Sequence, residues 1–165
     1  MPTISCTGHS LVKAKLRETG APFAGEMSGH LFFNDGRWPG FDDGVYAGAR
    51  ILEILSREAD PSAVLEALPS AVNTPELQIY MAEGENKAFI ARLQKEARFD
   101  DALDVITIDG VRVEWNDGFA LARSSNTTPV VVLRLEGDTP EALERIKRTF
   151  AEVLLKVDPS LELPF

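Results

Sequence analysis

The hydrophobic positions change their spacing near the middle of the chain, and this change predicts two regions. In residues 44–56 the apolar side chains recur at helical spacing, which predicts a helix with an unusually broad apolar face. That face is formed by Val45, Ala49, Ile51, Leu52, Ile54 and Leu55. From Leu77 onward apolar and polar residues alternate, which is the period of a half-buried strand. The stretch 69–75, which has a proline at each end, predicts a linker between the two regions.

The second region, residues 73–165, is predicted to fold as β-α-β-β-β-α. One helix is expected to begin at Asn86, whose side chain can cap it, and another to begin at Pro140. Asp109-Gly110 predicts a two-residue hairpin turn, because such a turn needs positive backbone angles at both positions. These elements would enclose one core between a four-stranded, mostly antiparallel sheet and two helices on one face of it.

The first region, residues 1–72, predicts β-α-β-α-α, which is an incomplete α/β segment with few strands for its apolar helices. A sheet that small would leave helix 44–56 poorly covered, so we expect its apolar face to be exposed. The predicted fold class is therefore α+β overall, with one domain at 1–72 and a second at 73–165.

The composition restricts the classes of partner. The 165 residues include 17 basic and 26 acidic side chains, a formal net charge of -9, which argues against nucleic acid or an anionic membrane as a partner. Cys6 is the single cysteine, so no internal disulfide is possible and a reducing compartment fits. No apolar run approaches the roughly 18 residues of a membrane-spanning helix. We therefore expect a soluble, cytoplasmic protein.

Against this acidic background, the loop Arg123-Ser124-Ser125-Asn126-Thr127-Thr128-Pro129 is notable because it contains no carboxylate. Nearly every side chain in it can donate a hydrogen bond, and the guanidinium of Arg123 offers a planar pair of donors to phosphate or carboxylate oxygens. The loop is therefore a candidate anion site between two predicted strands. The alternative is a polar turn that carries a surface arginine.

A second cluster, Gly25-Glu26-Met27-Ser28-Gly29-His30, places a carboxylate beside a hydroxyl on a glycine-bounded loop. Sugar hydroxyls both donate and accept hydrogen bonds, so this pairing suits a sugar. The alternative is a turn at the end of a strand, in which Met27 faces the core and His30 is structural. His9, in Thr7-Gly8-His9-Ser10, could transfer a proton or bind phosphate, although a lone histidine in a turn is more often structural.

The sequence shows no pattern of metal ligands. It has no cysteine and histidine cluster for zinc and no closely spaced aspartates of a magnesium loop. Asp42-Asp43 is the nearest candidate, but capping of the following helix explains this pair better.

These motifs together resemble those of the α-D-phosphohexomutases, the family that includes bacterial phosphomannomutases/phosphoglucomutases. The stretch 25–30 resembles the family's sugar-recognition loop, and 123–129 resembles its C-terminal phosphate-binding loop. Residues 7–10 and 40–44 also fit, in the same order along the chain. The resemblance covers essentially the whole chain, which corresponds to the second half of the family's third domain and all of its fourth.

The resemblance implies roles for individual residues. Glu26, Ser28 and His30 would contact the sugar, and His9 would lie near the reacting end, where it would assist proton transfer or phosphate binding. The phosphate that is not being transferred would be held by Arg123, Ser125, Asn126 and Thr127. The ligands implied are mannose or glucose 1- and 6-phosphates, with hexose 1,6-bisphosphate as the intermediate; the sequence does not distinguish the two sugars. Ser124 and Cys6 depart from the family pattern, where alanine and a basic residue are common.

The family transfers a phosphoryl group from a phosphoserine with the help of Mg²⁺, and neither the serine loop nor the aspartate-rich loop occurs in these 165 residues. The resemblance therefore implies a substrate-binding part of an intramolecular phosphotransferase that is inactive alone and works with the N-terminal domains of the same enzyme. The alternative is a stand-alone, non-catalytic phosphosugar-binding module.

Overall fold

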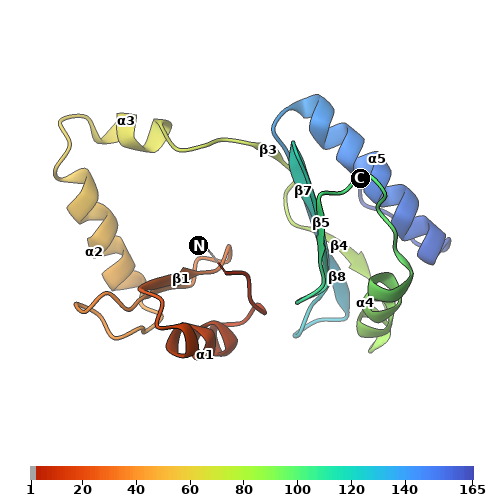
Figure 1. Ribbon diagram of the computed structural model, residues 1–165, viewed down its shortest axis with the longest axis horizontal. Coiled ribbons are helices and arrows are strands. Elements are labelled where there is room, and N and C mark those ends of the chain that lie inside the picture. The colour runs from red at the N-terminus through yellow and green to blue at the C-terminus, as the bar shows by residue number, and fades with distance from the viewer. Residues whose placement is uncertain (1–2) are drawn as a thin grey trace. The chain divides into compact units, whose positions relative to one another are not determined.

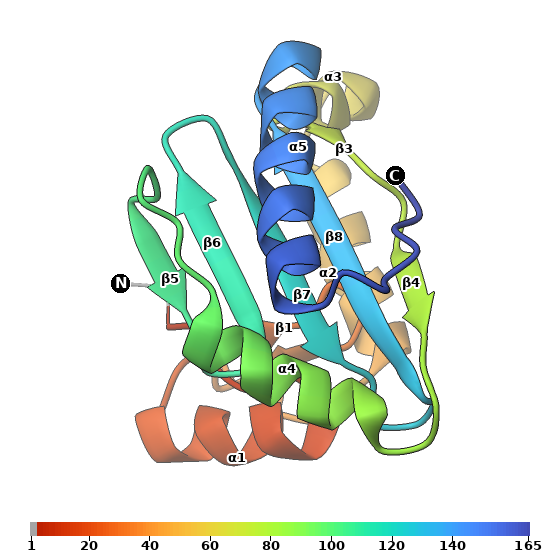
Figure 2. The ribbon, with the colours of Figure 1, turned by 90° about the vertical axis from the view of Figure 1, so that its right-hand side faces the viewer.

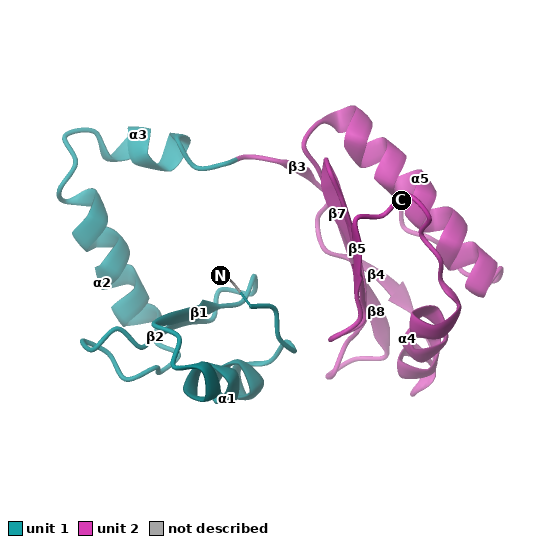
Figure 3. Cartoon of the chain, in the orientation of Figure 1, with its two compact units in different colours: residues 1–69 teal, residues 70–165 magenta. Residues whose placement is uncertain are grey.

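The computed structural model describes residues 3–165, and the chain divides into two compact units, residues 1–69 and 70–165 (Figure 3). Each unit is described by itself. Mixed helices and antiparallel strands confirm the predicted α+β class.

The second unit is built on one antiparallel sheet. Its strands are β3 (Val72–Asn73), β4 (Leu77–Tyr80), β5 (Asp104–Ile106), β6 (Val111–Trp115), β7 (Gly118–Ser124) and β8 (Val130–Gly137). The sheet thus has six strands instead of the predicted four. One of the additional strands, β3, lies in the stretch 69–75 that the sequence predicts to be a linker. β3 and β4 pair with successive parts of the same edge of β8, so they act as one interrupted edge strand. The remaining order across the sheet is β8, β7, β6 and β5.

Two helices, α4 (Glu85–Glu96) and α5 (Pro140–Val157), cover one face of this sheet, as predicted (Figures 1 and 2). Thr139 caps α5 by accepting a hydrogen bond from the backbone N–H of Ala142, and Pro140 occupies the first turn. The helices and the covered face of the sheet share one apolar core. Its fully buried members are Leu93, Val113, Ala120, Ala122, Val131, Leu133, Leu135, Ile146, Phe150 and Leu154.

The hairpin between β5 and β6 differs from its prediction. A two-residue Asp109-Gly110 turn would pair residue 108 with Val111. The last observed pair is Ile106 with Arg112, and four residues, 107–110, connect the end of β5 to the start of β6. Gly110 has a φ of 101°, and a Cβ there would lie 2.2 Å from the carbonyl oxygen of Ala122. The glycine is therefore required by the close approach of β7 rather than by the two-residue turn that the sequence suggests.

The first unit has little sheet and exposed helices. Its strands β1 (Phe23–Gly25) and β2 (Leu31–Phe33) form a hairpin, and its helices are α1 (His9–Thr19), α2 (Gly44–Leu55) and α3 (Pro61–Glu66). A small core contains Val12, Leu16 and Phe32. No residue of α2 is buried, and Val45 and Leu52 are 86% and 66% exposed, which confirms the exposed apolar face predicted for this helix.

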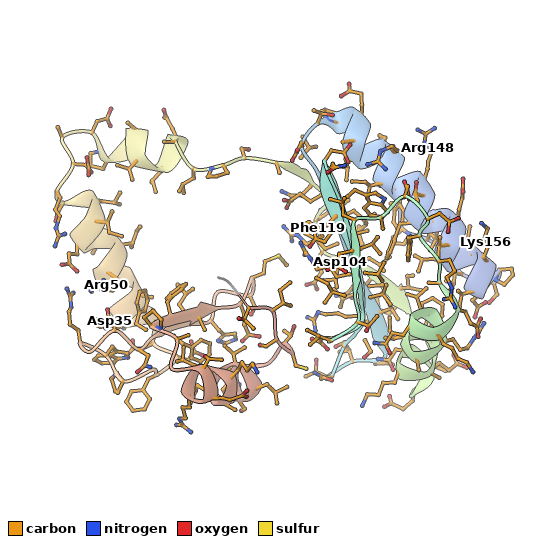
Figure 4. All side chains as sticks on the ribbon, in the orientation of Figure 1. Asp35, Arg50, Asp104, Phe119, Arg148 and Lys156 are labelled. Atoms are coloured by element: carbon orange, nitrogen blue, oxygen red, sulfur yellow. The ribbon has the colours of Figure 1, made fainter. Side chains whose placement is uncertain are left out.

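Polar contacts attach α2 to the loop that follows β2. Asp43 caps the helix by accepting hydrogen bonds from the N–H groups of Val45 and Tyr46. Arg50 Nη1 lies 3.4 Å from Asp35 Oδ2 (both side chains are labelled in Figure 4), and the guanidinium of Arg37 donates two hydrogen bonds to the Glu53 carboxylate. The hydrogen bond from Arg37 lowers the pKa of the Glu53 carboxyl despite its partial burial. These charged pairs, together with the stacking of Tyr46 on Trp38 at 4.5 Å between ring centroids, hold a helix that the small core does not cover.

Within residues 3–165, no helix combines the length and hydropathy needed to cross a membrane.

The second unit should depend strongly on the aromatic centre of its core. Phe150 is fully buried and stacks on Phe99, with ring centroids 5.8 Å apart. Phe150→Ala should therefore lower the free energy of unfolding of this unit by about 3–5 kcal/mol. Urea unfolding followed by Trp115 fluorescence in a Trp38→Phe background measures this unit alone, because those are the two tryptophans of the chain.

Glu152→Ala, on the exposed side of the same helix, is the control and should change the stability by less than about 0.5 kcal/mol. Equal effects of the two substitutions would contradict the core described above.

Candidate functional site

The donor-rich loop joins two strands at the centre of the second unit's sheet. β7 and β8 pair continuously up to Ser124 opposite Val131, and the backbone N–H of Ser125 then donates to the carbonyl of Val130 at 3.0 Å. The last strand pairs therefore fix both ends of the loop. Residues 126–128 project beyond the sheet and are exposed.

The hydroxyl of Ser125 organises the interior of this loop. Its Oγ accepts hydrogen bonds from the backbone N–H groups of Thr127 and Thr128, at 3.3 and 3.2 Å, and from the Thr128 hydroxyl at 2.9 Å. The Thr127 hydroxyl lies 3.4 Å from the same atom. The loop is thus a compact turn closed by one serine, with the side chain of Asn126 exposed at its tip.

Arg123 lies at the base of the loop, opposite Val132 in the β7–β8 register, and is half-buried. Within residues 3–165 its guanidinium makes no hydrogen bond or ion pair. The turn 124–129 adds no carboxylate, so a positive charge with free donors stands beside exposed hydroxyl and amide groups. This arrangement suits an anion with several oxygens, such as a phosphate.

The second cluster forms the turn of the β1–β2 hairpin in the first unit. The N–H of Glu26 donates to the carbonyl of His30 at 2.9 Å, and the N–H of Gly29 donates to the carbonyl of Glu26 at 3.0 Å. Oε1 of Glu26 accepts a 2.7 Å hydrogen bond from the backbone N–H of Gly8, the residue that precedes α1. The carboxylate therefore ties the hairpin turn to the segment that carries His9.

The two histidines of the chain meet at this end of the first unit. Their ring centroids are 6.3 Å apart, and Nδ1 of His30 lies 2.6 Å from Oδ2 of Asp42. An isolated backbone bridge between Phe32 and Asp42 brings that aspartate to the hairpin. His9, Glu26 and His30 are thus brought together, and Ser28 is exposed in the same turn.

These positions decide between some of the readings that the sequence left open. Met27 is 68% exposed, so the alternative in which it faces the core is wrong. Two side-chain contacts of these loops differ from what the sequence predicts. The sequence offers Asp42 and Asp43 equally as caps of the following helix, but Asp43 caps α2 and Asp42 contacts His30. Asn86 was predicted to cap α4, but Gly84 occupies the cap position and Asn86 reaches the donor loop instead.

The Mg²⁺ that the family resemblance implies does not fit the residues of this chain. Among residues 3–165 no group of three or more histidine, cysteine, aspartate or glutamate side chains is arranged to hold a metal ion. The donor loop itself offers hydrogen-bond donors rather than anionic ligands, which is the opposite of a cation site.

Comparison with known proteins assigns the family. A model of "Phosphoglucomutase/phosphomannomutase, alpha/beta/alpha domain III" matches residues 3–72, and a model of the family's C-terminal domain matches residues 76–153. The chain belongs to the phosphoglucomutase/phosphomannomutase family. The family resemblance read from the two loops is therefore confirmed.

Individual members of the phosphoglucomutase/phosphomannomutase family are similar over almost all of this chain. A phosphoglucomutase of Neisseria gonorrhoeae is 56% identical over 149 residues, which are 90% of this chain and 32% of the relative. A phosphomannomutase/phosphoglucomutase of Pseudomonas aeruginosa is 52% identical over 165 residues, 99% of this chain and 35% of the relative. A solved structure of a family protein from Burkholderia thailandensis has a TM-score of 0.92 at 62% identity and covers 99% of this chain and 34% of its own. The chain thus spans about a third of the length of these relatives.

Proposed function

We propose that this chain forms the sugar- and phosphate-binding part of a phosphomannomutase/phosphoglucomutase, an isomerase that exchanges phosphate reversibly between the 1- and 6-positions of a hexose. The observation that supports this most is the unpaired Arg123 beside the serine-closed loop, in a chain that belongs to this family. The ligands would be mannose or glucose 1- and 6-phosphates and the hexose 1,6-bisphosphate formed between the two half-reactions.

In this proposal the loop holds the phosphate that is not being transferred. A phosphate monoester presents three oxygens with a charge near -2, and the planar fork of Arg123 can bind two of them. The hydroxyls of Ser125 and Thr127 and the amide of Asn126 would bind the remaining oxygen sites. Because the phosphate is bound rather than cleaved here, the site needs geometry and charge but no nucleophile.

The hairpin turn would recognise the sugar. Oε2 of Glu26 is buried and has no hydrogen-bond partner within the described residues, so it is available to a sugar hydroxyl. Ser28 and His30 supply a hydroxyl and an imidazole on the same turn, and both are exposed. His9 would stand near the reacting end, where an imidazole can transfer a proton or bind phosphate.

We assign residues 1–72 to a partial third domain with the sugar-recognition loop and residues 73–165 to a phosphate-binding C-terminal domain. This C-terminal domain would close over the substrate and would thereby exclude water from the reaction. The phosphoserine and the Mg²⁺ site would be supplied by N-terminal domains of the same enzyme in the cytoplasm. A stand-alone binding module is not favoured, because the relatives described above are named as mutases.

The role of Arg123 can be tested by titration calorimetry of the whole 165-residue chain with glucose 1-phosphate. Arg123→Gln should raise Kd about 10- to 100-fold, because hydrogen bonds to a charged group contribute about 1.5–3 kcal/mol. Arg123→Lys should recover only part of this loss, since lysine keeps the charge but not the planar fork.

Arg148→Gln is the matched control. It removes the same charge from an exposed site on α5, labelled in Figure 4, and should change Kd less than twofold. Equal losses for Arg123→Gln and Arg148→Gln would show a general charge effect and would contradict the proposed site.

The purified chain should show no mutase turnover with mannose 1-phosphate or glucose 1-phosphate, even with Mg²⁺ and glucose 1,6-bisphosphate added. Phosphoryl transfer requires a phosphorylated nucleophile and a metal to neutralise charge, and the described residues contain no cluster for the metal. A coupled assay for glucose 6-phosphate measures this. Turnover that persists through repeated purification would contradict the proposal that the phosphoserine and the Mg²⁺ site lie on other domains of the enzyme.

A further inference from the structure

Asn86 is one of two buried polar or charged residues among those described, and it lies in the first turn of α4 with 4% exposure. Its Nδ2 donates to the carbonyl oxygens of Ser125, Thr128 and Val130, at 3.2, 3.3 and 3.3 Å. Its Oδ1 accepts from the backbone N–H of Lys87 at 2.9 Å, a first-turn group with no partner inside the helix. The amide orientation follows from these partners, because only the NH₂ end can donate to carbonyls.

The three carbonyls bracket the tip of the donor loop. Ser125 and Thr128 flank Asn126 and Thr127, and Val130 begins β8. Two hydrogens of one NH₂ group are therefore shared among three backbone oxygens that lie 39 to 44 residues along the chain from Asn86. This single side chain from a helix fixes the path of the loop between its two strands.

Holding the Ser125 carbonyl inward has a consequence for the next residue. In a trans peptide the C=O and the following N–H point in opposite directions, so the N–H of Asn126 is turned away from Asn86. That N–H has no hydrogen-bond partner in the described part of the chain. The inward-facing N–H groups of Thr127 and Thr128 are taken up by Ser125 Oγ. The backbone donor left for a ligand is thus the one at the exposed tip.

We infer that Asn86 is a positioning residue for phosphate binding: its buried carboxamide holds the loop carbonyls inward and so aims the Asn126 N–H at a phosphate monoester. Asn86 does not touch the ligand itself. This inference rests on the proposed function of the loop, which is the binding of the non-transferred phosphate of a hexose phosphate.

Thr74 is the matched control, because it is the other buried polar residue and also bonds to the β8 backbone. Its hydroxyl accepts from the N–H of Leu135 at 3.2 Å and lies 3.4 Å from the carbonyl of that residue, five residues along the strand from Val130. Asn86→Leu and Thr74→Val each replace a buried polar side chain by an apolar one of similar shape. Both should destabilise the unit, but only the first disturbs the loop.

The test is an NMR titration of each 165-residue variant with glucose 1-phosphate and, separately, with inorganic phosphate. Asn86→Leu should raise Kd for both ligands about tenfold and reduce the shift of the Asn126 amide. The reason is that the Asn126 N–H would no longer be held toward the phosphate, which removes one hydrogen bond to a charged ligand. Thr74→Val should change Kd less than twofold at a comparable loss of stability in urea. If Asn86→Leu does not fold, Asn86→Ala, which lets water reach the carbonyls, serves for the same comparison.

The outcomes separate the two claims. If the unaltered chain binds neither ligand at the loop, the proposed function fails and this inference fails with it. If the unaltered chain binds and Arg123→Gln abolishes binding, while Asn86→Leu or Asn86→Ala binds with unchanged Kd, the positioning role alone is overturned. Equal weakening by Asn86→Leu and Thr74→Val would show that Asn86 acts only through general stability, and would also overturn it.

Discussion

The antiparallel pairing of β7 with β8 is the constraint on which the second unit depends. Its register, with Ser124 opposite Val131, places Ala120, Ala122, Leu133 and Leu135 on the face that packs against the helices. Since side chains alternate along a strand, the same register places Arg123 on the opposite face. A slip by one residue would exchange the two faces and would bury the guanidinium. Core packing and the position of the candidate phosphate site are thus decided together.

The first unit is organised differently, by polar contacts more than by a core. Glu26 connects the hairpin turn to Gly8, Asp42 contacts His30, and Glu53 and Asp35 connect α2 to the loop at 35–38. These contacts gather the chemistry-bearing residues without burying α2. The family model that matches this region describes an alpha/beta/alpha domain, an architecture in which helices pack on both faces of a sheet.

The features that can be predicted from the sequence are those with a clear hydrophobic periodicity or a distinctive local composition. The apolar stripe of α5 and the apolar run at the start of β8 each predict their element locally. The exposed face of α2 is predicted because the first region has few strands to cover its apolar helices. The donor loop was recognisable because its composition contrasts with an acidic chain.

What could not be predicted depends on partners far away in the sequence. β3 is two residues long and exists only because it pairs with β8, and the β5–β6 register reflects the approach of β7 to Gly110. Asn86 is of a residue type that commonly caps helices, but the loop carbonyls that it binds lie at least 39 residues away, so no local pattern reveals them. The contact of Asp42 with His30 also has no local sequence signal, because it depends on the backbone bridge that brings Asp42 beside Phe32.

The central claim is that one chain carries a phosphate site in one unit and a sugar site in the other. Mapping of backbone amide shifts with three ligands at millimolar concentration tests it directly: inorganic phosphate, glucose and glucose 1-phosphate. We predict that phosphate shifts residues 124–128, that glucose shifts residues 26–30, and that glucose 1-phosphate shifts both sets. Shifts by phosphate that spread over other exposed cations such as Arg148 and spare residues 124–128, or no shift at 26–30 with either sugar, would contradict the account.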